Sequence, residues 1–226
     1  MVMKMINKDE LMYNYIHDSE VYLYQRKDMF RMNTDTALLA HFMRIECNES
    51  ILDIGTNNGA LLCYAALFKP KMMYGVDILE EACELANYNL KDRDVDYQII
   101  CSDIKDIELN NIDVIVCNPP YFPYDETSNS NDSIYLKTAR HEVFLTLDTL
   151  CYKVSTILKD KGRFYMVHRA NRLQEIMTSL SKYGLYVKVM KLIYDENKEE
   201  AIGVLIEAYK DSGYGMKVLT PIINTR

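Results

Sequence analysis

The sequence predicts an α/β fold: a mostly parallel sheet of seven strands, with helices on both faces and an antiparallel hairpin at one edge. Two observations support this prediction. From residue 50 onward, short apolar segments alternate with segments of helical periodicity, which is typical of parallel strands joined by helices. The last two apolar segments are separated only by a charged turn, residues 195–200, so these two strands are expected to pair antiparallel.

The predicted elements begin with a short hairpin within residues 11–24, where apolar and tyrosine side chains alternate. A helix is expected over residues 36–43, with one of residues 33–35 as its N-cap. The strands are predicted at residues 51–55, 72–76, 97–101, 112–117, 163–167, 186–193 and 201–208, and the remaining helices at residues 60–68, 79–90, 142–158 and 173–182. Residues 125–132 are polar and are expected to form a loop.

The composition indicates one globular domain. The chain has 226 residues, 49% of them hydrophobic, which is enough for a single well-filled core. Its net charge of −7 argues against a general polyanion binder. Six cysteines without a CxxC pair are expected to be small buried residues in a reducing compartment, and they give little support for a metal site. No signal peptide or apolar span is evident, so we expect a cytoplasmic protein that does not enter membranes.

A glycine-containing turn after the first predicted strand of the sheet is the first chemical signal. Asp53, Gly55 and Gly59 surround a turn in which the backbone can approach a ligand closely, and the spacing differs from the GxGxxG of nicotinamide binders. The next strand ends at Asp77, where a carboxylate can accept both hydroxyls of a ribose, and the third ends at Ser102-Asp103. The turn lacks Lys and Arg, so a positively charged nucleoside fits it better than a phosphate does.

The stretch Asn118-Pro119-Pro120-Tyr121 follows the fourth strand and can act on an amino group. The Asn118 side-chain oxygen and the Pro119 carbonyl are two rigidly held acceptors, and accepting from both N–H groups of an aromatic amine frees the lone pair of its nitrogen. Tyr121 offers a face on which a planar target can stack. A plain β-turn is the simpler interpretation of Asn-Pro, but the order of the upstream signals favours a catalytic role.

These motifs resemble class I S-adenosylmethionine-dependent methyltransferases of the amino-group type, which have a Rossmann-like fold. The resemblance implies a single domain over residues 1–226, with residues 1–49 as an extension packing over the cofactor site. It implies S-adenosyl-L-methionine as cofactor and no metal. The implied cofactor-binding residues are Asp35, Asp53, Gly55, Gly59, Asp77, Ile78, Ser102, Asp103 and Asn118. The implied catalytic residues are Asn118, Pro119 and Tyr121, and the implied substrate-binding residues are Tyr121, Phe122, Arg140 and His141.

Three further segments, residues 30–39, 139–142 and 168–173, resemble a bacterial subgroup that methylates N6 of adenine 37 in tRNA-Val. The expected partner is therefore tRNA, and no feature points to an obligate protein partner. One position departs from the family pattern, because Asn57 stands where the family usually has glycine. Asparagine tolerates positive φ better than other non-glycine residues, so the turn can survive, although cofactor affinity could be lower.

Two other functions remain compatible with the sequence. A protein methyltransferase acting on glutamine N5 of a translation factor would share the same chemistry, but that class usually carries an additional N-terminal helical domain. A non-catalytic nucleoside-binding module would not require both Asn118 and Tyr121. For an acidic chain that binds RNA, phosphate contacts must be local, and the candidates are Arg26, Lys27, Arg31, Lys137, Arg140, Arg169 and Arg172.

Overall fold

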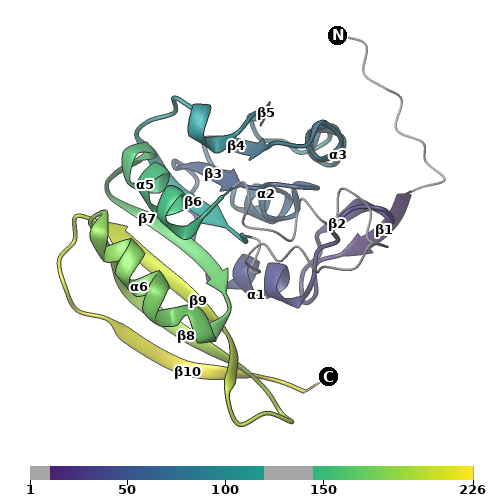
Figure 1. Cartoon of the computed structure of the whole chain (residues 1–226). Helices are drawn as coiled ribbons and strands as arrows, with labels where there is room; N and C mark the ends of the chain where they lie inside the picture. The colour runs from purple at the N-terminus through teal and green to yellow at the C-terminus, as the bar shows by residue number, and fades with distance from the viewer. Residues whose placement is uncertain (1–10, 120–144, 226) are drawn as a thin grey trace, which may run out of the picture.

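The computed structural model describes residues 11–119 and 145–225. Its main sheet has the strand order β10-β8-β9-β7-β6-β3-β4-β5 (Figure 1). The strands are β3 (Ser50–Ile54), β4 (Met72–Asp77), β5 (Tyr97–Cys101), β6 (Ile112–Cys117), β7 (Leu158–His168), β8 (Leu185–Asp195), β9 (Ala201–Lys210) and β10 (Lys217–Asn224). The helices are α1 (Thr34–Phe42), α2 (Ala60–Ala65), α3 (Glu80–Leu90), α5 (Leu147–Ile157) and α6 (Leu173–Lys182), with short 3-10 turns η2 (Ala66–Phe68), η3 (Ile104–Asp106) and η4 (Ala170–Arg172).

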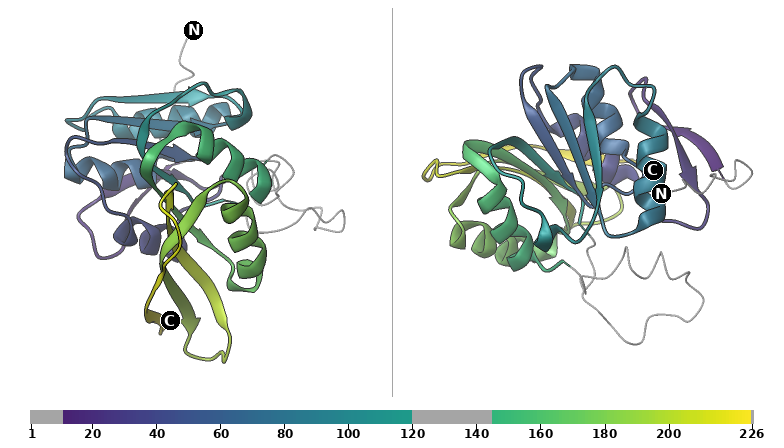
Figure 2. Two further views of the ribbon diagram at one scale, coloured as in Figure 1. Left: turned by 90° about the vertical axis from the view of Figure 1, so that its left-hand side faces the viewer. Right: turned by 90° about the horizontal axis from the view of Figure 1, so that it is seen from above.

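Helices cover both faces of this sheet, and the side-chain alternation of each strand explains why. In β6, Val114 and Val116 pack with residues of α1 and α2, whereas Ile115 and Cys117 pack with residues of α5 and α6. Strands buried on both faces need apolar residues at nearly every position, as β6 has. The view from above shows the sheet between the two helical layers (Figure 2). The predicted α/β fold is therefore confirmed.

The sheet has eight strands in the described part of the chain, one more than predicted. The additional strand, β10, pairs parallel with β8 and takes the outermost position, so the antiparallel β8–β9 pair is not itself the edge of the sheet. Pro221 within the strand concealed it in the sequence, because proline usually interrupts strands. Pro221 is tolerated where the β8–β10 register shifts, between Leu219 and Ile222.

Most other element boundaries agree with the prediction, but the helix predicted over residues 142–158 differs at both ends. In the described residues α5 begins at Leu147, after its N-cap Thr146, and ends at Ile157. Leu158 is both the C-cap of α5 and the first residue of β7, which runs through Gly162 to His168 and so begins before the predicted position. The predicted N-terminal hairpin is present as β1 (Leu11–Tyr15) and β2 (Tyr22–Arg26). Asn33 is the N-cap of α1, with its side chain and Thr36 forming a reciprocal capping box.

The cysteines are all free, but the expectation that they are buried is wrong for two of them. Cys47 and Cys101 are exposed, whereas Cys63, Cys83, Cys117 and Cys151 are buried. Cys101 occupies the last position of β5, which is the outermost strand at its end of the sheet. None of the helices in the described residues has both the length and the apolar character needed to cross a lipid bilayer.

Candidate active site

The turn after β3 has the backbone conformation that its glycines allow. Gly55 and Gly59 have φ of +73° and +74°, values that side chains rarely adopt. The N–H groups of Gly55 and Thr56 both donate to the Val76 carbonyl, at 2.9 and 3.0 Å, which ties the turn to the end of β4. A Cβ added to Gly55 would meet no atom within 4 Å. Gly55 is exposed, so the backbone here is open to a ligand.

Gly59 is favoured for a different reason. It precedes α2, and a Cβ at this position would lie 3.3 Å from both Cα and Cβ of Ala86 in α3. That contact is tighter than most, and the positive φ of Gly59 adds strain for any side chain, so glycine favours this close packing of α2 against α3. The two glycines therefore differ: Gly55 borders open space, and Gly59 lies in a tight contact between two helices.

Asp53 lies beneath the turn and is buried. Its Oδ2 accepts a hydrogen bond from the Thr56 hydroxyl at 2.9 Å, so one carboxylate oxygen organises the turn. Its Oδ1 is buried and has no hydrogen-bond partner among the described residues. Burial raises the pKa of Asp53 to about 7, the Thr56 hydrogen bond opposes this shift, and the neighbouring Asp77 charge adds to it. Near neutral pH this carboxyl is therefore close to its pKa, and a nearby cation would favour its charged form.

Asp77, at the end of β4, faces the same turn. Its Oδ2 accepts the Asn57 N–H at 2.9 Å and its Oδ1 accepts the Leu79 N–H at 3.0 Å. Burial raises the pKa of Asp77, although these backbone hydrogen bonds favour the charged form. The next residue, Ile78, is an exposed apolar side chain beside this carboxylate. An acidic group and an apolar surface therefore lie together at the end of the strand.

Asn57 adopts the left-handed conformation expected of the glycine it replaces, with φ of +48°. Its side chain also makes a contact that glycine could not make: Nδ2 donates to the Phe30 carbonyl at 2.6 Å. The segment before α1 is thereby attached to the turn. The departure from the family pattern consequently preserves the backbone conformation and adds a link to the N-terminal region.

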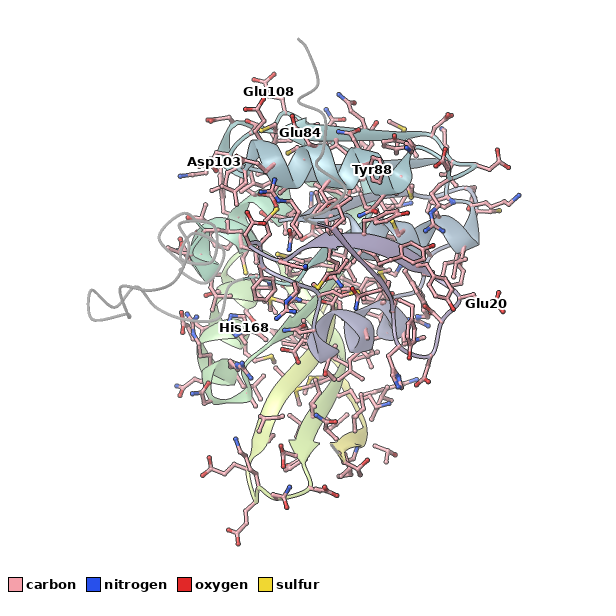
Figure 3. The ribbon with its side chains drawn as sticks, turned by 90° about the vertical axis from the view of Figure 1, so that its right-hand side faces the viewer. Glu20, Glu84, Tyr88, Asp103, Glu108 and His168 are labelled. Carbon is pink, nitrogen blue, oxygen red and sulfur yellow. The ribbon has the colours of Figure 1, made fainter. Side chains whose placement is uncertain are left out.

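Asp103 follows β5 and is held by its own local structure. Its Oδ1 accepts the Lys105 N–H at 2.9 Å as the N-cap of η3, and its Oδ2 lies 2.9 Å from the Lys105 ammonium. Burial raises the pKa of Asp103, but the Lys105 hydrogen bonds and charge more than offset this, so the pKa is lowered overall. The preceding Ser102 N–H donates to the Asp77 carbonyl at 2.9 Å. Asp103 follows β5, and His168 is the last residue of β7. In Figure 3 both lie on the side of the molecule away from Glu20.

Asn118 and Pro119 immediately follow β6, at the same edge of the sheet as the turn after β3, because these strands are parallel neighbours. Asn118 is half-buried and Pro119 is buried. The Asn118 Nδ2 donates to the Thr36 hydroxyl of α1 at 3.1 Å. Asp35, the residue before Thr36, is in the first turn of the same helix. Tyr121, Phe122, Lys137, Arg140 and His141 lie outside the described residues.

Three polar side chains connect the predicted site residues to the N-terminal region, and the sequence analysis missed them. Asn89 of α3 accepts the Tyr24 N–H at 2.8 Å and donates to the Tyr24 and Asn58 carbonyls at 2.9 and 2.8 Å. Gln25 accepts from the Met32 N–H at 2.8 Å and from the Asn58 Nδ2 at 3.4 Å, and the third residue, Thr36, accepts from Asn118. A signal was available for two of them: Gln25 and Asn89 occupy the buried positions of a strand and a helix that are otherwise apolar.

No group of three or more His, Cys, Asp or Glu side chains in residues 11–119 and 145–225 is arranged to hold a metal ion. The acidic residues at the strand ends instead accept hydrogen bonds from backbone N–H groups and from the Thr56 hydroxyl. The chemistry available at this edge is therefore that of carboxylate, amide and carbonyl acceptors.

Comparison with known proteins gives consistent matches. A family model for the methyltransferase small domain matches residues 20–191. A tRNA1(Val) (adenine(37)-N6)-methyltransferase from Pedobacter heparinus is 32% identical over 175 residues, which cover 75% of this chain and 74% of the relative. One from Phocaeicola vulgatus is 29% identical over 196 residues, covering 84% of this chain and 81% of the relative.

Solved structures support the same fold at low sequence identity. A tRNA m1G37 methyltransferase from M. jannaschii matches with a TM-score of 0.68 and 13% identity, covering 90% of this chain and 58% of the other. TYW2 from M. jannaschii, solved in complex with AdoMet, matches with a TM-score of 0.62 and 14% identity, covering 91% and 88% of the two chains. The Rossmann-like methyltransferase fold expected from the sequence is thus confirmed.

Proposed function

Because this chain belongs to the methyltransferase small domain family, we propose that it transfers a methyl group from S-adenosyl-L-methionine to N6 of an adenine in tRNA. The observation that carries the proposal is the position of Asn118-Pro119 next to the turn after β3, at one edge of the sheet. In parallel α/β sheets, ligands bind beyond this edge. We propose that residues 1–226 act as one domain in the cytoplasm, where tRNA is used.

The residues at this edge fit the cofactor. The exposed Gly55 backbone leaves room for the amino-acid part, and the buried Asp53 Oδ1 is suited to an ammonium group. Asp77 suits the ribose hydroxyls and the exposed Ile78 an adenine face, with Ser102 and Asp103 at the neighbouring strand end. When bound, the cofactor supplies a methyl group on a positively charged sulfur. Two contacts support the proposal that residues 1–49 pack over this site: Asn57 with Phe30, and Asn118 with Thr36.

The proposed catalytic step depends on holding the target amine correctly. The Asn118 side-chain oxygen and the Pro119 carbonyl accept the two N–H groups of the adenine amine, so its nitrogen lone pair is directed at the methyl carbon. With the donor bound beside Asn118 and Pro119, the N–C bond would form as the C–S bond breaks, and the electron pair of that bond would remain on sulfur. The product nitrogen then loses a proton to water. Positioning and electrostatics supply this catalysis, without a metal ion.

The specific nucleotide is proposed from the relatives. The two curated relatives are named for adenine 37 of tRNA1(Val), and together they align with most of this chain. We propose the same nucleotide here. A base in an anticodon loop must be splayed out to enter such a site. Tyr121, Phe122, Arg140 and His141 are the proposed contacts to that base and its flanking phosphates.

The test is methyl transfer to unmodified total tRNA with a tritiated donor, followed by digestion and mass identification of the labelled nucleoside. Labelled N6-methyladenosine, mapped to tRNA-Val, is the expected result. Label in another nucleoside would overturn the proposed target. A parallel reaction contains a translation factor in place of the tRNA, and label found only in a glutamine of that factor would establish the protein methyltransferase instead. Binding of the donor with no transfer to either substrate would indicate a nucleoside-binding module.

The matched variant is Asn118→Ala. We expect it to reduce kcat by at least about 100-fold, because it removes one of the two acceptors on the amine. The Kd for the donor, measured by calorimetry, should stay within a few-fold of wild type. A large loss of donor affinity with little change in kcat would mean that Asn118 binds the cofactor and does not activate the amine.

A further inference from the structure

We propose that Thr36 is a positioning residue, which determines that the oxygen of the Asn118 amide, and not its nitrogen, faces the target amine. The inference rests on the proposed function, because it concerns the acceptor role of Asn118. Thr36 lies 82 positions before Asn118 in the chain, in the first turn of α1. It is buried, with 6% of its surface exposed.

An asparagine amide has a donor end and an acceptor end of almost the same shape. Either end can therefore face a given pocket unless its surroundings distinguish a donor from an acceptor. Only one orientation supports the proposed reaction. With the nitrogen toward the adenine amine, two donors would oppose each other, and the amine nitrogen would keep its lone pair delocalised.

The hydrogen bonds around Thr36 make this distinction. The Thr36 N–H donates to Asn33 Oδ1 at 3.0 Å, and because a backbone N–H can only donate, this end of Asn33 must be the oxygen. The Thr36 hydroxyl lies 3.2 Å from the same oxygen, so it donates its single hydrogen there. The Asn33 N–H approaches the hydroxyl at 3.4 Å and occupies one lone pair. The hydroxyl thus has no hydrogen left for Asn118.

The consequence for Asn118 follows directly. The Thr36 oxygen meets the Asn118 side chain as an acceptor, at 3.1 Å, so Asn118 must present its Nδ2 to this helix. The amide oxygen is then directed away from Thr36. The capping box of α1 accordingly has a second role: besides starting the helix, it sets the polarity of the amide that follows β6.

The experiment compares Thr36→Val with Thr36→Ser. Valine has the shape of threonine but lacks the hydroxyl, so we expect kcat for tRNA methylation to fall about tenfold, as for the loss of one hydrogen bond. The donor Kd should stay within twofold. Serine keeps the hydroxyl and should restore kcat to within about threefold of wild type. All variants are assayed below their thermal unfolding transitions.

A matched control separates this effect from the loss of a helix cap. Thr146 is the N-cap of α5, and its hydroxyl accepts the Thr149 N–H at 3.2 Å. Thr146→Val loses a helix-capping hydrogen bond without touching Asn118, so it should lower the melting temperature while leaving kcat for tRNA methylation within about twofold of wild type. If Thr36→Val retains wild-type kcat, or if Thr36→Ser fails to restore it, the inference is overturned.

A readout without substrate distinguishes failure of this inference from failure of the proposed function. In ¹H–¹⁵N NMR of the full chain, the Asn118 side-chain NH₂ should be shifted and protected from exchange in wild type and Thr36→Ser. In Thr36→Val the protection should be lost. An unprotected Asn118 NH₂ in wild type would overturn the inference, whatever the chain methylates. A protected one in a chain that transfers no methyl group would overturn the function alone.

Discussion

Asp53 has a buried carboxyl in which one oxygen has no hydrogen-bond partner among the described residues. The other oxygen accepts from Thr56, and the pKa of the carboxyl is raised to about 7 by burial, with a further contribution from Asp77. Parallel α/β enzymes place charged groups at this edge for ligands. Burial disfavours the charged form of this carboxyl, and a bound cation would favour that form and lower the pKa again. Asp53 therefore links pH to both folding and binding, in opposite directions.

We expect the contribution of Asp53 to the free energy of unfolding to fall as pH rises from about 4 to 7 and then to level off. In that interval the unfolded carboxyl has lost its proton and the folded one retains it, so the folded state binds more protons. The buried His168, whose pKa is lowered to about 4, contributes in the opposite direction over part of this range. Donor affinity should instead increase as pH rises through about 7, because an ammonium group is attracted to the charged carboxylate. Urea titrations and calorimetry at several pH values measure the two trends.

Asp53→Asn is the variant that tests this assignment. It keeps an oxygen that can accept from Thr56 but cannot titrate, so the difference between wild type and this variant should show both pH trends of Asp53. If the variant shows the same pH dependence as wild type, another group, of which Asp77 is the first candidate, is responsible.

At the scale of elements, Asn89 connects three parts of the molecule. From the buried face of α3 it makes hydrogen bonds to both backbone groups of Tyr24 in β2 and to the Asn58 carbonyl in the turn after β3. The N-terminal hairpin and the proposed cofactor turn thus depend on one amide. Its two ends are both used, so no residue of similar size can replace it without leaving a buried backbone group unsatisfied.

We expect Asn89→Ala to reduce the free energy of unfolding by about 2–4 kcal/mol, because it leaves buried backbone groups without partners. Asn89→Asp should not rescue, since a carboxylate can accept from Tyr24 but cannot donate to the two carbonyls. Asn87, two positions earlier, bonds only within its own helix through its side chain, and Asn87→Ala should cost less than about 1 kcal/mol. Equal losses in Asn87→Ala and Asn89→Ala, measured by urea unfolding, would contradict this account.

The elements also show how far sequence reasoning reaches. The strands that carry the turn, Asp77 and Asn118 were predicted to within about two residues, because buried parallel strands have unmistakable apolar runs. β10 was not predicted, because Pro221 divides its apolar residues and proline is unusual inside a strand. The contacts of Thr36, Asn57 and Asn89 could not be predicted either, because each joins residues that are distant in the chain, and polar residue types alone do not specify a partner.

At the scale of the whole molecule, the net charge of −7 disfavours broad electrostatic binding of the proposed tRNA substrate. Two of the predicted phosphate contacts are partly neutralised by ion pairs, since Arg26 pairs with Asp28 at 2.7 Å and Arg172 with Glu175 at 2.6 Å. We expect binding to depend on few phosphate contacts and on the local chemistry of the base pocket. This differs from proteins that hold nucleic acid through a broad basic surface.

We therefore expect a shallow dependence of tRNA affinity on salt. A plot of log Kd against log salt concentration should have a slope corresponding to roughly 2–4 released counterions, compared with the 6–10 contacts of strongly electrostatic binders. Filter binding of tRNA-Val at several salt concentrations measures the slope. A much steeper slope would show that a basic surface, not evident from the overall charge, dominates binding.

The chain contains no tryptophan, so its ultraviolet emission comes from its 18 tyrosines. Ile78 is 38% exposed beside Asp77, so Ile78→Trp would give the molecule a single indole fluorophore at this position without enlarging a buried side chain. If an adenine ring lies against residue 78, adding S-adenosylhomocysteine should quench this emission, and titration would give the affinity optically. Unchanged emission under saturating ligand would place the purine elsewhere.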